Sequence, residues 1–74
     1  MMYFYEDKQY IIAMLLQVLR CTRAGYDIDQ INYEVLGNGT ELAVIIYVDG
    51  RRKPINITAD SGVAMMRDIL RGIE

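Results

Sequence analysis

The chain has 74 residues, a net charge of −2, no histidine and one cysteine. A chain of this length folds as a single domain, residues 1–74, and buries only about 60% of the surface that its unfolded form exposes. One cysteine excludes an internal disulfide, and the composition lacks the ligands of a structural zinc site, so we expect no cofactor and no metal. The core would then need support from a protein partner or from a second copy of the chain.

The net charge is too small to favour either nucleic-acid affinity or an acidic surface that imitates DNA. Residues 1–5 contain no cation and run into Glu6 and Asp7, so we expect no export signal. The apolar run at 10–21 is too short to span a membrane. Because a lone thiol favours a reducing compartment, the pattern predicts a cytoplasmic protein.

The first predicted element is a helix over residues 7–24, which Asp7 can cap and Gly25 can end. Its apolar arc is much wider than the stripe of about 100° that an ordinary surface helix needs, so we expect the helix to bury more than one side. The aromatic residues before the helix either fold back over a helix–sheet edge or join a dimer contact. The residues expected in a homodimer or packing contact are Tyr3, Phe4, Tyr10 and Met14.

Three strands are predicted next, over residues 30–35, 41–48 and 54–58. Residues 30–35 alternate between apolar and polar side chains, as a half-buried strand does, whereas residues 41–48 are apolar on both faces, as a central strand is. The dipeptides Asn38-Gly39 and Asp49-Gly50 are strong hairpin signals. Pro54 lacks a backbone N–H group and belongs on an edge strand.

The last predicted element is a helix over residues 60–71, capped by Asp60 or Ser61 and ended by Gly72. The order α-β-β-β-α predicts an α+β fold. In this fold a three-stranded antiparallel meander sheet carries both helices on one face.

The two turns predict which strand positions share a face, because side chains alternate across a strand. A two-residue turn at Asn38-Gly39 pairs Ile31 with Ile46 on the core face. For the second hairpin, turns of two or four residues keep the same faces together, and the longer one holds Lys53 away from the core. The predicted open face comprises Gln30, Asn32, Glu34, Ala43, Ile45, Tyr47, Pro54 and Asn56.

The open face and the hairpin tip each have two interpretations. The face is either solvated or a partner surface anchored by Ile45 and Tyr47. The cations at 51–53 either keep an edge hairpin in water or contact an acidic protein or a phosphate backbone. The residues expected to bind a partner are Arg51, Arg52, Lys53, Tyr47, Ile45, Gln30 and Asn32.

The sequence carries no pattern that indicates catalysis. It has no histidine, and Cys21 lies late in the first predicted helix, away from the helix N-terminus that activates thiols. No two carboxylates have a spacing typical of a catalytic pair, and no glycine loop opens into a helix as a phosphate site does. We therefore expect a protein that is not an enzyme.

The order of elements over residues 7–73 resembles that of the double-stranded-RNA-binding domain. In that family, lysines at the start of the second helix grip phosphates across the major groove. The corresponding residues here, 57–62, include no lysine and place Asp60 where it would repel a phosphate. The resemblance implies the fold, and any nucleic-acid binding would depend on the cationic hairpin tip.

The chain also resembles small phage-encoded inhibitor proteins, including some anti-CRISPR proteins. The matching stretches are residues 42–50, residues 55–58 and a helix opened by Asp60-Ser61. The resemblance implies a protein-interaction module that inhibits or modulates a host protein. Acidic members of this group imitate DNA, whereas this hairpin tip is cationic, so we expect binding through Arg51, Arg52 and Tyr47. The alternatives are nucleic-acid binding through the tip and a self-assembling structural subunit.

Overall fold

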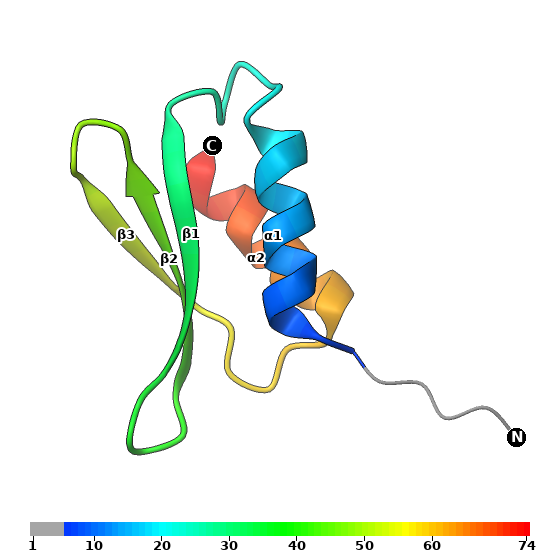
Figure 1. Cartoon of the computed structure of the whole chain (residues 1–74). Coiled ribbons are helices and arrows are strands. Elements are labelled where there is room, and N and C mark those ends of the chain that lie inside the picture. The colour runs from blue at the N-terminus through cyan, green and yellow to red at the C-terminus, as the bar shows by residue number, and fades with distance from the viewer. Residues whose placement is uncertain (1–5) are drawn as a thin grey trace, which may run out of the picture.

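A computed structural model describes residues 6–74, and the elements follow in the predicted order. They are α1 (Lys8–Leu19), β1 (Ile28–Val35), β2 (Glu41–Tyr47), β3 (Arg52–Asn56) and α2 (Gly62–Ile73). The strands form one antiparallel meander with β2 in the centre, and both helices lie on the same face of it (Figure 1). The predicted α+β fold is therefore confirmed. No helix among residues 6–74 has the length and apolar content needed to cross a membrane.

Helix α1 begins where the sequence predicts and ends early. The side chain of Asp7 accepts a hydrogen bond from the N–H group of Tyr10 at 3.2 Å, which caps the first turn. At the other end, the hydroxyl of Thr22 donates to the carbonyl of Leu19 at 2.6 Å and accepts from the N–H group of Gly25 at 3.1 Å. These bonds compete with a further helical turn, so the helix stops at Leu19 instead of residue 24.

Helix α2 is capped by Ser61, whose hydroxyl accepts from the N–H group of Ala64 at 3.2 Å. The prediction that Gly72 ends this helix is wrong, because the helix runs through Gly72 to Ile73. A Cβ atom at Gly72 would collide with the side chain of Ile55. The glycine thus allows the helix to lie close to β3 rather than marking its end.

Both hairpins close with three-residue loops instead of the predicted turns of two or four residues. In the first loop, the N–H group of Leu36 donates to the carbonyl of Thr40 at 2.8 Å, and the N–H group of Gly39 donates back to the carbonyl of Leu36 at 3.0 Å. The second loop, residues 48–50, repeats this pattern. Gly39 and Gly50 have φ values of +90° and +94°, as the third residue of such a loop requires.

The loop length shifts the register by one residue and so reverses the faces of β2. Ile31 pairs with Ile45, and Ala43 pairs with both Tyr33 and Ile55, so the odd-numbered residues of β2 face the helices. The predicted faces are correct for β1 and β3 and wrong for β2: Ala43, Ile45 and Tyr47 face the helices, and Leu42, Val44 and Ile46 line the open face. Because β2 is apolar at successive positions, its hydrophobic pattern cannot reveal the shift.

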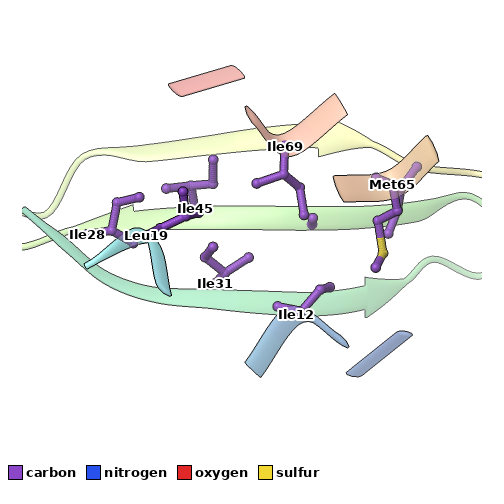
Figure 2. Packing of buried hydrophobic residues seen from close by; sticks show 9 residues of the cluster. Ile12, Leu19, Ile28, Ile31, Ile45, Met65 and Ile69 are labelled. Carbon is purple, nitrogen blue, oxygen red and sulfur yellow. The ribbon is translucent and has the colours of Figure 1, made fainter. Parts of the chain in front are cut away.

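The hydrophobic core lies between the sheet and the two helices. Figure 2 shows Ile12 and Leu19 of α1 and Met65 and Ile69 of α2 gathered over the same face of the sheet. They meet the β2 residue Ile45, which is fully buried. This one layer leaves the outer sides of the helices and the open face of the sheet as candidate sites.

Candidate functional site

The hairpin tip is held by contacts to Arg51. The guanidinium lies 4.4 Å from the centre of the Tyr47 ring and 2.8 Å from the carboxylate of Asp49. It also lies 3.7 Å from the carboxylate of Asp27, at the start of β1. The backbone N–H group of Arg51, followed by its side chain, lowers the pKa of Asp49, and Asp49 in turn raises the pKa of Arg51. Arg51 and Tyr47 are therefore brought together, in an arrangement that also orders the tip.

The three adjacent cations point in different directions and form no single patch. Lys53 faces the helices, where its ammonium group donates to the carbonyl of Gly72 at the C-terminal end of α2. That end of a helix attracts cations through its free carbonyls and its dipole. Arg52 lies on the open face, with its guanidinium 3.7 Å from the carboxylate of Glu34.

The open face carries the predicted partner residues Gln30 and Asn32 but not Ile45, which is buried in the core. Its centre is Val44, which is only 3% exposed although no helix among residues 6–74 covers this face. Arg52 lies beside Ile46 and Glu34 beside Leu42, so their ion pair crosses the row that contains Val44. This crossing accounts for the low exposure of Val44.

The outer sides of the two helices expose a contiguous apolar surface. Tyr10, Met14 and Val18 of α1 have exposed fractions of 64%, 47% and 62%. A groove of about 330 Å³ with almost no polar lining runs from these residues to Met66 of α2. We call the exposed apolar residues on this side, together with the half-buried Met66, the helical patch: Tyr10, Met14, Val18, Val63, Met66 and Leu70.

The helical patch contains two of the four predicted dimer residues, Tyr10 and Met14. The other two, Tyr3 and Phe4, lie outside the described residues. Sequence reasoning missed Val18, although its position four residues after Met14 continues the same stripe. It also missed Met66, because the sequence does not show which sides of the helices meet.

A second groove, of about 600 Å³, lies between α1 and the free edge of β1. The groove itself was not predicted, although two of the predicted partner residues, Gln30 and Asn32, line it. We call it the edge groove: Gln9, Ile12, Ala13, Leu16, Gln30, Ile31, Asn32, Tyr33 and Glu34. The signals that point to it are the small side chain of Ala13 in the middle of α1 and a β1 strand without proline.

Glu41 holds α1, the sheet and the loop before α2 together. Its carboxylate accepts from the ammonium of Lys8 at 2.8 Å, from the hydroxyl of Tyr33 and from the N–H group of Ala59 at 3.1 Å. These bonds, with Lys8 first, lower the pKa of Glu41 to about 2. The bond to Ala59 also fixes a non-glycine residue at a φ of +63°, a conformation that needs support.

Asp60 lies next to this cluster, and its pKa is shifted in the opposite direction to that of Glu41. Its Oδ2 atom is buried and has no hydrogen-bond donor among the described residues. A hydrogen bond with Asp68, together with burial, raises the pKa of Asp60, because two carboxyl groups in contact favour one shared proton.

Within residues 6–74, no three side chains of histidine, cysteine, aspartate or glutamate gather where they could hold a metal ion. The thiol of Cys21 is exposed and lies 3.4 Å from the carbonyl of Gln17 in the preceding turn.

A scan against models of protein families found no match, and searches of curated proteins and of solved structures found none either.

Proposed function

We propose that this chain is a non-enzymatic protein-interaction module that works as a homodimer joined through the helical patch. The observation that carries the proposal is the almost wholly apolar groove between α1 and α2. Two of the residues that line it, Tyr10 and Val18, are more than half exposed. Exposed apolar surface of this kind is typical of an interface. In a chain of 74 residues, burial of the patch would add to a small core.

The spacing of the patch on α1 supports a second copy as the occupant. Tyr10, Met14 and Val18 recur every four residues and are symmetric about Met14. If two α1 helices pack antiparallel across a two-fold axis at Met14, Tyr10 of each copy meets Val18 of the other. A large side chain then faces a smaller one on both sides of the axis, as a self-complementary interface requires.

The charges at the two ends of α1 favour the same arrangement. Glu6 and Asp7 lie at its N-terminal end, and Arg20 and Arg23 follow its C-terminal end. Antiparallel packing brings the acidic end of one copy to the basic end of the other and also opposes the two helix dipoles.

The most specific form of the proposal is an inhibitor or modulator of a host protein, as the resemblance to small phage-encoded inhibitors implies. A dimer joined through the helices leaves the hairpin tip free, where Arg51 and Arg52 are 64% and 58% exposed. Two exposed guanidinium groups suit an acidic protein surface. The exposed single thiol of Cys21 supports a reducing compartment such as the cytoplasm.

The separation of the three cations weighs against nucleic-acid binding, which uses a continuous basic surface. Lys53 turns to the end of α2, Arg52 lies on the open face beside Glu34, and Arg51 lies over Tyr47 at the tip. We expect no shift of double-stranded RNA or DNA in a gel at low salt, where phosphate contacts are strongest. A shift that weakens with added salt would favour the nucleic-acid alternative.

Light scattering after size exclusion tests the dimer. We expect the wild-type protein at about 100 μM to have twice the 8.5 kDa mass of one chain. Met14→Glu places two carboxylates at the two-fold axis and should yield a monomer. Val48→Glu is the matched control, because Val48 is 70% exposed at the distant hairpin tip, and it should remain a dimer. Circular dichroism confirms that both variants are folded.

A wild-type monomer at this concentration would overturn the homodimer. A dimer that survives Met14→Glu would place the interface elsewhere. The hairpin tip has its own test, since Arg51→Glu with Arg52→Glu should keep the dimer mass and abolish inhibition of the host protein.

A further inference from the structure

No strand among residues 6–74 pairs with the outer edge of β1, which we call its free edge. This edge offers a second interaction surface of a different kind. We propose that it binds an extended segment of another protein, which adds to the sheet as a fourth strand and places alternate side chains in the edge groove. This surface lies on the other side of α1 from the helical patch, so it does not depend on the proposed dimer.

The backbone of β1 presents hydrogen-bonding groups to this edge. The bond from Leu36 to Thr40 marks a hydrogen-bonded pair at the end of the β1–β2 ladder. Such pairs recur at every second residue of an antiparallel ladder, so Asn32 and Glu34 direct their N–H and C=O groups to β2. Ile31 and Val35 direct theirs to the free edge. An added strand can bond with these groups.

The edge groove supplies room for side chains of the added strand. It opens beside the backbone of β1 and is roofed by α1, where Ala13 leaves space and Leu16 supplies an apolar wall. Its volume of about 600 Å³ fits small apolar side chains from alternate residues. A helix beside an open strand edge thus gives both the backbone contacts and the side-chain contacts that bind an extended segment.

The two edges of the sheet differ in a way that supports this assignment. On β3, the residue at the middle of the edge is Pro54, which has no N–H group, and two cations, Arg52 and Lys53, come directly before it. Proline and cations are devices that prevent strand addition. The β1 edge has neither, although a bulge between Ile28 and Gln30 restricts the available length to about residues 30–35.

The charge of β1 indicates a foreign segment rather than the β1 strand of a second copy. β1 contains Asp29 and Glu34 and no cation, so a second β1 would bring further carboxylates to the edge. Side chains of the added strand that point away from the helices would lie beside Gln30, Asn32 and Glu34. The segment that fits has small apolar residues at alternate positions and polar or basic residues between them.

Selection from a random eight-residue peptide library displayed on phage tests the proposal. Wild-type protein should enrich peptides with this alternation, and Ala13→Arg, which fills the groove, should not. Ala24→Arg is the matched control, since Ala24 is exposed in the turn beyond α1. The best peptide should bind Ala13→Arg about tenfold or more weakly in titration calorimetry and bind the control as it binds the wild type.

Two further measurements separate strand addition from simple apolar contact. Methylation of the peptide amides that face β1 should weaken binding about tenfold, because it removes backbone hydrogen bonds to the sheet edge. In hydrogen exchange, the amides of Ile31 and Val35 should become protected on binding. The amides of Asn32 and Glu34, already bonded to β2, should change little.

Absence of enrichment over Ala13→Arg would overturn the proposal, and so would binding that tolerates amide methylation. Met14→Glu should bind the peptide as the wild type does. A wild-type protein that is a monomer and still binds the peptide would overturn the proposed dimer alone. A wild-type dimer that binds no peptide would overturn the strand-addition site alone.

Discussion

The carboxyl groups of Glu41 and Asp60 show how one neighbourhood shifts pKa values in both directions. Glu41 accepts three hydrogen bonds, which favour its charged form. Asp60 faces the carboxyl group of Asp68, and its buried Oδ2 atom has no donor among the described residues. The direction of each pKa shift follows from the hydrogen-bond donors and carboxyl groups that the fold places around Glu41 and Asp60.

Asp60→Asn should stabilise the protein at neutral pH. The raised pKa of Asp60 means that the folded state prefers the protonated form, so this group disfavours folding as the pH rises above 3.8. An amide can donate to Asp68 without taking up a proton. Urea unfolding should show a higher free energy of unfolding for the variant at pH 7 and little difference at pH 3. A loss of stability at pH 7 would contradict this account.

At the scale of the elements, the turns decide how the strands and helices meet. The loop at 37–39 and the loop at 48–50 use the same device, a side chain that accepts from the backbone two residues later. Asn38 accepts from the N–H group of Thr40, and Asp49 accepts from that of Arg51, both at 3.0 Å. Each loop then ends in a glycine of positive φ, which fixes an odd loop length.

Gly25→Ala should destabilise the turn between α1 and β1. A Cβ atom at Gly25 would lie 2.6 Å from the backbone oxygen of Leu19, where no side-chain rotation can relieve the clash. We expect a loss of about 1–3 kcal/mol in the free energy of unfolding, the usual cost of overpacking. Gly37→Ala is the control, because nothing lies within 4 Å of the corresponding Cβ. Equal effects of the two substitutions in urea unfolding would contradict the role given to Gly25.

At the scale of the whole molecule, Glu41 joins α1, the sheet and the loop before α2, so it should determine the stability to acid. Its pKa is lowered from 4.5 to about 2. The stabilisation is therefore fully present above pH 4.5 and is lost as the pH falls toward 2. Glu41→Gln should lower the melting temperature at pH 7 and flatten its pH dependence between 4.5 and 2. Glu74→Gln, at the exposed C-terminal residue, should keep the wild-type dependence.

The sequence by itself determined the order of the elements, their approximate positions and the edge placement of Pro54, because capping, turn and alternation signals act over a few residues. It also pointed to Tyr10 and Met14, whose apolar side chains exceed what one helix face needs. The faces of β2 were decided only by the tertiary structure. Residues 42–47 of β2 are apolar on both faces and fit the core in either register, so the loop lengths determine which face is buried.

Tertiary structure also decided which surfaces exist. Met66 reaches the helical patch, and Ala13 opens the edge groove, because of how the helices lie on the sheet. The sheet also separates the adjacent cations. Because side chains alternate along β3, Lys53 lies against the end of α2 and Arg52 lies on the open face. Local signals specify elements, whereas long-range packing and register specify the surfaces that a partner can meet.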